Sequence, residues 1–387
     1  MVAERNNGNK LRILIVHNYY QIPGGEDTVV ANEKKLLEDH GHEVTLYTRS
    51  NDELKSMAKW RKLLLPFTTI YNPRTAKDIK RIIVEKKIDI VHVHNTLNLI
   101  SPAVYYAARE LKVPVVQTMH NFRLLCPGAT FYRDGHICEE CVHKNIWCSV
   151  KHACYRKSRL QTLLCAINTK IHRMTGIVGD INYIALTEFN KDKLLQIKQI
   201  KPEKVFLKPN FVEQDAEEKH RTGFIYAGRL DELKGIKTLV EAWKIMGKNA
   251  PHLIICGTGP LEEWCKNEIH GLNVEMKGFV NNEAVKQMIA RSCSIILPTL
   301  WYEGFPMTIL EAYSVGTPVI CSDIGNAGSV VTEGVTGWKF TVGDAKGLVK
   351  VVRNWYDISD SVYTVFMEKY TPESNYEQLL HIYSAIK

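Results

Sequence analysis

Residues 301–311 read Trp-Tyr-Glu-Gly-Phe-Pro-Met-Thr-Ile-Leu-Glu. This stretch places two carboxylates, Glu303 and Glu311, eight positions apart around a Gly-Phe-Pro turn. The apolar run at 295–297 predicts a buried strand before the turn, and residues 318–321 predict another strand after a helical pattern. The stretch therefore predicts a strand–loop–helix–strand unit whose loop carries the chemistry.

The start of the predicted helix suits an anion. Pro306 fits the first helical position, where its missing N–H costs nothing. The N–H groups of Met307, Thr308 and Ile309 would then be free, with the positive end of the helix dipole behind them. Glu311 would lie about 7–8 Å further along the axis, within reach of a hydroxyl group attached to a bound phosphate. The alternative is a solvated helix that carries two incidental acids.

Predicted strands alternate with predicted helices in both halves of the chain. Alternation of this kind predicts right-handed crossovers and a doubly wound parallel sheet in each half. The predicted strands are 11–16, 43–47, 89–94, 113–118 and 183–186 in the first half, and 223–227, 252–256, 273–277 and 294–297 in the second. The predicted helices include 236–246 and 282–290.

Length and composition fit a two-domain globular protein. The chain has 387 residues, of which 45% are hydrophobic, and no stretch reaches the roughly 18 apolar residues of a membrane-spanning helix. Residues 1–10 lack the apolar centre of a secretory signal, so we expect a cytoplasmic protein. The net charge of +8 fits an anionic substrate or membrane face, but it is too diffuse to indicate nucleic acid.

Several ordered motifs together resemble those of one enzyme family. They are Pro23-Gly24-Gly25-Glu26, Thr118-Met-His120-Asn, Lys208-Pro-Asn210, Gly228-Arg229-Leu with Lys234-Gly235, Gly257-Thr-Gly259-Pro260, Gly278-Phe-Val280 and the Glu303…Glu311 pair. With them the chain resembles the retaining nucleotide-sugar glycosyltransferases of family 4, which have the GT-B fold.

The resemblance implies an α/β protein with two Rossmann-like, doubly wound parallel-sheet domains that face a central cleft. We expect an N-terminal domain over 1–210 and a charged linker over 211–221. A nucleotide-sugar-binding domain would follow over 222–371. The helix over 372–387 would cross back to the first domain.

The family pattern also assigns roles to residues of this sequence. It implies that Glu311 binds ribose hydroxyls, that Glu303 faces the transferred sugar, and that His120 approaches that sugar from the N-terminal domain. Further donor-binding positions implied by the resemblance are Gly24, Gly25, Gly228, Val280 with Phe279, Gly304, Phe305, Thr308 and Ile309.

Protein cations are the expected partners of the donor diphosphate. The chain contains no Asp-x-Asp, the motif with which many glycosyltransferases of the other main fold hold a metal. Arg229 and Lys234 lie five apart in a glycine-flanked loop, and such a pair can stabilise a leaving diphosphate. We therefore expect no cofactor for catalysis. Retention would follow a front-face route in which the leaving phosphate takes the proton of the acceptor.

Cysteines crowd the segment 126–154. A Cys-x-x-Cys with two further thiols has the ligand count of a structural Zn²⁺ site. The expected ligands are Cys126, Cys138, Cys141 and Cys154, with free thiols in a loop as an equal alternative. Disulfides are not expected in a cytosolic chain.

Residues 52–65 predict a basic amphipathic helix with a tryptophan, which suits an anionic bilayer surface. Its predicted stripes are Leu54, Met57 and Leu64 on one side and Lys55, Lys59 and Lys62 on the other, with Trp60 close to both. A surface helix packed on its own domain is the alternative. His92 and His94 share one face of a predicted strand, and for His94 a satisfied buried histidine is favoured over contact with an acceptor.

Together these features predict a retaining glycosyltransferase that uses a UDP- or GDP-sugar. The acceptor would be lipid-linked or a saccharide, in cell-surface polysaccharide synthesis, with the enzyme at the inner face of the plasma membrane. The alternative is a transferase similar to glycogen or sucrose synthases that acts on a soluble acceptor. A zinc-bearing nucleic-acid-binding protein is disfavoured, because that function leaves the paired glutamates and the Arg–Lys loop unexplained.

Overall fold

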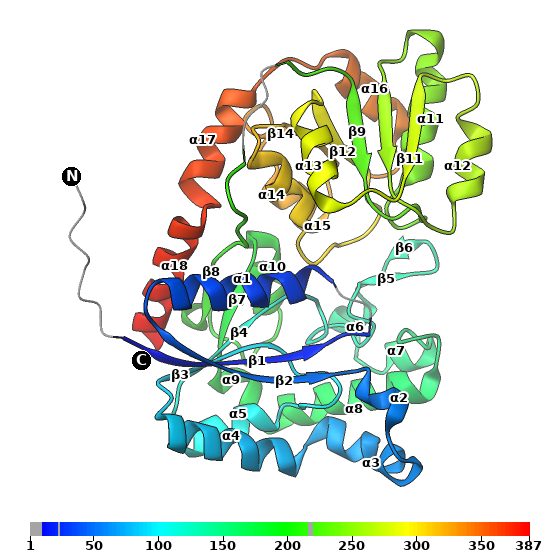
Figure 1. Cartoon of the computed structure of the whole chain (residues 1–387). Helices are drawn as coiled ribbons and strands as arrows, with labels where there is room; N and C mark the ends of the chain where they lie inside the picture. The colour runs from blue at the N-terminus through cyan, green and yellow to red at the C-terminus, as the bar shows by residue number, and fades with distance from the viewer. Residues whose placement is uncertain (1–9, 22–23, 216–219) are drawn as a thin grey trace, which may run out of the picture.

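The structure is a computed structural model that describes residues 10–21, 24–215 and 220–387. It contains two α/β domains, which lie one above the other in Figure 1. Each domain is built on a six-stranded sheet, and every strand pair in these two sheets is parallel. The GT-B fold class expected from the sequence is confirmed.

The N-terminal sheet has the strand order β2-β1-β3-β4-β7-β8. Alternate residues of β1 enter opposite cores: Leu14 and Val16 pack with α4 and α5, whereas Ile13 and Ile15 pack with α1 and α18. The strands are β1 (Arg12–Tyr19), β2 (Glu43–Ser50), β3 (Ile90–Asn95), β4 (Val115–Thr118), β7 (Asn182–Ala185) and β8 (Val205–Leu207). The main helices are α1 (Gly25–Asp39), α4 (Pro73–Lys86), α5 (Ala103–Glu110), α8 (Arg159–Met174), α9 (Ile177–Asp180) and α10 (Glu188–Leu195).

The C-terminal sheet has the order β11-β10-β9-β12-β13-β14. Its two faces carry separate cores, one against α11 and α16 and the other against α14 and α17. The strands are β9 (Phe224–Ala227), β10 (Leu253–Cys256), β11 (Val274–Gly278), β12 (Ser294–Leu297), β13 (Val319–Ser322) and β14 (Gly337–Phe340). The helices are α11 (Ile236–Met246), α12 (Glu262–Glu268), α13 (Asn282–Ala290), α14 (Met307–Tyr313), α15 (Gly325–Val330), α16 (Ala345–Arg353) and α17 (Ser359–Lys369).

The last helix, α18 (Pro372–Ile386), returns to the N-terminal domain along one side of the molecule (Figure 1). Its Leu379, Ile382 and Tyr383 are buried against β1 and α1. The strand orders place a topological switch point between β1 and β3 in one sheet and between β9 and β12 in the other. Ligands of open α/β sheets bind outside the carboxyl ends of strands at such points, and these two points place the candidate site.

Two segments differ from their prediction. The stretch at 52–65 is not one helix, because extended residues at Met57 and Ala58 separate α2 (Glu53–Ser56) from α3 (Lys59–Ile70). The proposed stripe of Leu54, Met57 and Leu64 is therefore wrong. The cysteine segment is more than a loop, and its elements are β5 (Tyr132–Arg133), β6 (His136–Ile137), α6 (Glu140–His143) and α7 (Cys148–Lys151).

Within the described ranges, no helix combines the length and the apolar character needed to cross a bilayer.

Candidate active site

The loop that follows β9 packs tightly against neighbouring strand ends. Gly235 has a φ of +70°, and a Cβ there would lie 1.7 Å from the carbonyl oxygen of Pro298. A Cβ on Gly257 would lie 1.9 Å from the carbonyl oxygen of Gly228. Only glycine fits at these two positions, so the sequence brings the β9 loop directly beside the end of β12.

This packing pairs Lys234 with Glu303 across 69 positions of sequence. The Nζ of Lys234 lies 2.7 Å from Oε2 of Glu303, whose side chain is only 11% exposed. Asp231 shapes the loop, because its Oδ1 accepts the backbone N–H of Lys234 and its Oδ2 lies 3.1 Å from Nε of Arg229. Arg229 is 66% exposed at the side chain and is therefore open to a ligand.

An open pocket on the C-terminal domain is lined by several of the predicted donor-binding residues. Gly228, Arg229, Val280, Thr308 and Glu311 all line it. Burial raises the pKa of the Glu311 carboxyl, an effect that Lys286 opposes. The exposed ring of Phe279 stands beside Val280 at the same pocket.

The start of α14 differs from the expectation in two respects. Pro306 precedes the helix with φ −75° and ψ 99°, so it is the capping residue and not the first helical residue. The N–H of Ile309 is not free, because it donates to the carbonyl oxygen of Pro306 at 3.0 Å. The side chain of Ile309 is fully buried in the core. Ile309 is therefore structural, and the early closure of the first turn removes it from the predicted set of free donors.

The N-terminal domain presents its glycine loop to this helix start. A Cβ on Gly25 would lie 3.5 Å from Cγ of Met307, so the two domains face each other there. The loop is held by Asp27, whose Oδ2 accepts the N–H of Gly24 at 3.0 Å and whose Oδ1 lies 2.7 Å from Nε2 of His17. Pro23 of the same motif lies outside the described residues.

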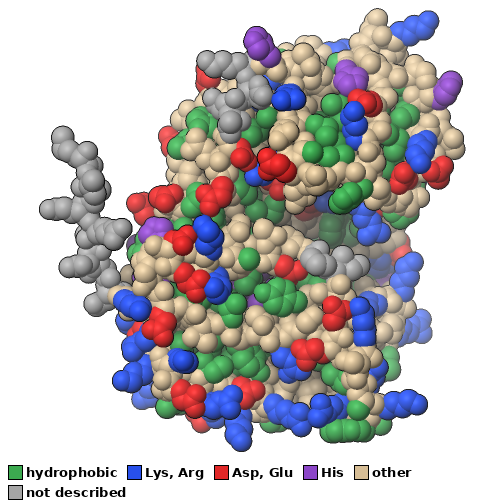
Figure 2. Space-filling model, in the orientation of Figure 1, with side chains coloured by type: hydrophobic (Ala, Val, Ile, Leu, Met, Phe, Trp, Pro, Cys, Tyr) green, Lys and Arg blue, Asp and Glu red, His purple; other side chains and the backbone are tan. Residues whose placement is uncertain are grey.

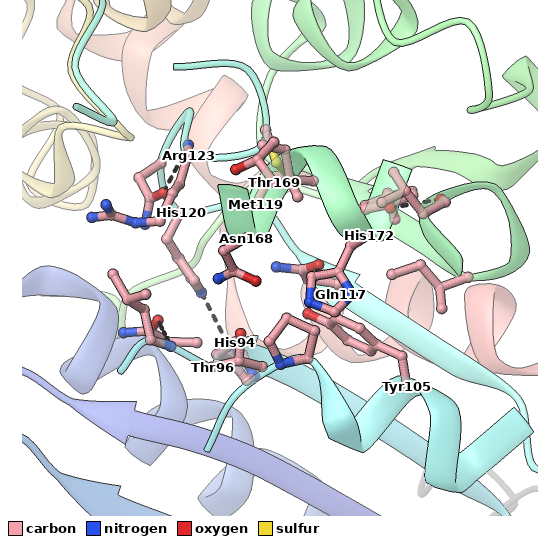
Figure 3. Close-up of a pocket in the computed structure, with 18 of the residues that line it drawn as sticks. His94, Thr96, Tyr105, Gln117, Met119, His120, Arg123, Asn168, Thr169 and His172 are labelled. Carbon is pink, nitrogen blue, oxygen red and sulfur yellow. Dashed lines mark hydrogen bonds between the residues drawn. The ribbon is translucent and has the colours of Figure 1, made fainter. Parts of the chain in front are cut away.

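His120 follows β4 and meets the C-terminal domain through its backbone. A Cβ on Gly304 would lie 2.2 Å from the carbonyl oxygen of His120. The ring of His120 is hydrogen-bonded to His94, with Nε2 and Nδ1 2.9 Å apart. Figure 3 shows both rings on one side of an N-terminal pocket, opposite Tyr105 and His172.

The structure also brings in residues that the sequence analysis did not single out. Tyr302 donates a hydrogen bond to Glu139 of the cysteine segment at 2.9 Å. Lys193 also bonds Glu139, at 2.7 Å, and Thr187 bonds Asn326 across the domains. These contacts join residues 54 to 163 positions apart, and no short motif signals them. They hold the loop of Glu303 against the N-terminal domain.

The cysteine segment fits a zinc ion only in part. Cys126 and Cys154 both border Gly128, where a Cβ would lie 3.6 Å from Sγ of Cys126 and 3.3 Å from Cβ of Cys154. Burial and the neighbouring Cys126 raise the pKa of Cys141 to about 12 and that of Cys154 to about 11. Sulfur atoms around one tetrahedral zinc lie about 3.8 Å apart. Among the described residues, however, only Glu33, His92 and His94 place three ligand atoms within 4.8 Å of one another.

Comparison with known proteins agrees with this geometry. The model of the glycosyl transferases group 1 family matches residues 208–370, and that of glycosyltransferase family 4 matches residues 23–145. The chain is a glycosyltransferase whose C-terminal domain is similar to the group 1 glycosyl transferases. Its two matches cover both walls of the cleft, so the N-terminal glycine loop and the C-terminal Lys234–Glu303 pair both lie within matched sequence.

Individual relatives of this glycosyltransferase are distant. An uncharacterised glycosyltransferase of Methanocaldococcus jannaschii is 24% identical over 77% of this chain and 75% of its own. An amylovoran biosynthesis glycosyltransferase of Erwinia amylovora is 30% identical over 32% of this chain and 33% of its own. The structure of Anabaena HepE, solved in complex with UDP, has a TM-score of 0.66 at 16% identity and covers 97% of this chain and 100% of its own. At that identity it shows the shared fold.

Proposed function

We propose that this glycosyltransferase transfers a sugar, with retention of anomeric configuration, from a UDP- or GDP-sugar. The observation that carries the proposal is the Lys234–Glu303 pair, which stands beside a pocket lined by Arg229 and Glu311. Arg229 and the Glu311 carboxylate within one pocket, with Lys234 in the adjoining loop, match the diphosphate and the ribose of a nucleoside diphosphate. The complex of Anabaena HepE with UDP supports the same donor class.

Each cleft residue then has a role in the transfer. Lys234 and Arg229 stabilise the negative charge that grows on the diphosphate as its bond to the anomeric carbon breaks. Glu311 accepts hydrogen bonds from the ribose hydroxyls, and Glu303 orients the sugar while it holds Lys234. The acceptor oxygen bonds to the anomeric carbon on the face that the diphosphate leaves, and its proton passes to the leaving phosphate oxygen. Arg229 and Lys234 supply the positive charge in this proposed route, and no step in it uses a cofactor.

A thermal-shift panel of UDP-, GDP-, ADP- and dTDP-sugars tests the donor assignment. One base should raise the melting temperature of the wild type and should do so much less for Glu311→Ala. The anomeric configuration of the product, read by NMR, tests retention. A glycosyl–enzyme intermediate trapped on any side chain would overturn the front-face route.

The acceptor is proposed to be lipid-linked, because one face of the N-terminal domain suits an anionic bilayer. Exposed apolar side chains of α3 and α8 lie among exposed cations, and the two helices pack together. The apolar set is Trp60, Leu63, Leu64, Phe67, Leu160 and Met174, and the cations are Lys59, Arg61, Lys62, Arg156, Lys157, Arg159 and Lys170. Figure 2 shows such a mixture at the bottom of the molecule, near α3.

Liposome flotation tests this surface. The wild type should float with vesicles that contain anionic lipid, and Leu63→Gln with Phe67→Gln should abolish flotation. Val84→Gln is the control, because Val84 is an apolar side chain that is 64% exposed on α4, outside this surface. Equal recovery of the wild type with and without anionic lipid, together with transfer to a soluble glucan, would favour the alternative of a soluble acceptor.

We also propose that Cys126, Cys138, Cys141 and Cys154 hold a structural Zn²⁺. Binding of the ion would bring their sulfur atoms to about 3.8 Å from one another. The ion would brace the segment that carries Glu139 and, through it, Tyr302. About one equivalent of zinc in purified wild type, lost in Cys138→Ser, is the expected result. Less than a tenth of an equivalent in the wild type would contradict the site.

A further inference from the structure

A polar pocket lies inside the N-terminal domain, between the end of β4 and helix α8 (Figure 3). Within the described part of the chain, its walls contain no aspartate or glutamate, and Arg123 is their one lysine or arginine. The other polar groups at its walls are amides, hydroxyls and histidine rings, among them Asn121, Asn168 and Thr169. The pocket therefore holds one fixed positive charge and no fixed negative charge.

The charge of Arg123 has no counter-ion in the structure. One of its N–H groups donates to the carbonyl oxygen of Pro127 at 3.1 Å, and its guanidinium lies 5.1 Å from the centre of the Tyr155 ring. Neither contact supplies a negative charge, and no described carboxylate forms an ion pair with Arg123. A partly buried cation is costly unless it is paired. The pocket therefore favours an anionic ligand.

Three weak acids near Arg123 are mostly protonated at neutral pH. Burial and the nearby Asp27 raise the pKa of Glu26 to about 8, although Arg123 opposes that shift. Burial also raises the pKa of Tyr20 to about 12 and that of the Cys165 thiol above its ordinary value. At pH 7 these groups therefore leave the charge of Arg123 uncompensated.

Asn168 of α8 is a second unpaired polar group at the same pocket. Its Oδ1 is buried without a hydrogen-bond partner among the described residues, although buried polar groups are normally hydrogen-bonded. A half-turn of the amide would exchange Oδ1 with the two N–H groups of Nδ2. Asn168 can therefore donate a hydrogen bond to an anion inside the pocket.

The size of the pocket suits a phosphate group. Its interior offers about 80 Å³. At roughly 10–15 Å³ for each water-sized group, this space holds the five heavy atoms of a phosphate but not the twelve of a hexose. The guanidinium of arginine matches phosphate oxygens, to which it can donate two parallel hydrogen bonds.

Helix α8 separates this pocket from the surface proposed to meet the bilayer. Cys165, Asn168 and Thr169 line the pocket, whereas Leu160 and Met174 on the opposite side of the helix are exposed. The width of a single helix, about 10–12 Å, therefore lies between the proposed bilayer face and the pocket. This position suits a phosphate that is attached to a membrane lipid.

We propose that this pocket binds the phosphate group of a phosphorylated acceptor, with Arg123 and Asn168 as hydrogen-bond donors. A lipid-linked acceptor would place its phosphate there and its sugar toward the cleft, because His120 both lines the pocket and contacts Gly304 at the domain junction. The assignment to an acceptor rests on the proposed function. The phosphate site itself is a property of the N-terminal domain.

Titration calorimetry of the full-length protein with decyl phosphate, below its micelle concentration, tests the site. The wild type should bind decyl phosphate at least tenfold more tightly than decyl glucoside, which has the same chain without a phosphate. Asn168→Asp keeps the shape of the side chain but adds a negative charge, so it should weaken this binding about tenfold or more, as should Arg123→Gln. Gln161→Glu makes the same change of charge at an exposed position of α8. It is the matched control and should leave the affinity unchanged.

The outcomes separate the site from its ligand and from the proposed function. Equal affinity of the wild type for the two decyl compounds, or equal affinity of Asn168→Asp and the wild type for decyl phosphate, would overturn the site even if Arg123→Gln fails to fold. Inorganic phosphate that binds as tightly as decyl phosphate would support the phosphate site but overturn its assignment to a lipid. Absence of UDP binding in the wild type would overturn the proposed function and leave the phosphate site standing.

Discussion

Gly304→Ala is expected to hold the two domains apart at the active site. The added Cβ would lie 2.2 Å from the carbonyl oxygen of His120. A carbon and an oxygen in contact need about 3.2 Å or more, so the junction must open by about 1 Å. The clash lies between two domains that have separate cores. The interface can therefore open without unfolding either core. An error of about 1 Å between reacting groups costs on the order of 10²-fold in rate.

The assay compares turnover, nucleotide affinity and thermal unfolding in the same variant. Turnover should fall about 100-fold, while UDP affinity stays within about twofold, because Arg229 and Glu311 line a pocket of one domain. Gly25→Ala on the opposite wall is the comparison. Its Cβ would meet only a flexible side-chain atom of Met307, at 3.5 Å, so we expect a smaller loss. Near-normal turnover in Gly304→Ala, or a collapse of its melting temperature, would refute the reasoning.

Three further predictions follow from the same geometry. Lys234→Ala should lower kcat about 10²- to 10³-fold, as the loss of one preorganised charge does, and a normal rate at saturating donor would contradict the role of Lys234. Glu311→Ala should weaken UDP binding about tenfold or more in titration calorimetry, and unchanged affinity would remove Glu311 from the ribose site. Burial and the nearby Asp27 raise the pKa of Glu26 to about 8 from 4.5. Between those values the folded state keeps a proton that the unfolded chain releases, so the free energy of unfolding should fall as pH rises, by about 1.4 kcal/mol per unit of pKa difference. Denaturation at pH 5 and pH 8 should show this slope in the wild type and a flatter one in Glu26→Gln, and equal slopes would contradict it.

Local patterns predicted most of the elements well. The bounds of α11, α13, α18 and β12 agree with the ranges expected from periodicity and from glycine and proline positions. The three helices each bury one face, and β12 is a short apolar run buried on both faces, so their apolar patterns are visible in sequence. The break at Met57 and the early first turn of α14 were not visible, because either conformation suits the residues and packing selects between them.

The sequence by itself determined the fold class and the motifs of each domain that face the cleft. Repeating strands and helices require two parallel sheets, and glycines such as Gly235 mark loops that pack too closely for a side chain. Only the tertiary structure decided which polar groups meet. Lys234 with Glu303, Tyr302 with Glu139, and Glu33 with His94 are pairs that lie far apart in sequence. Their partners are set by how parallel strands align their carboxyl ends and how two domains close, which no local pattern of residues encodes.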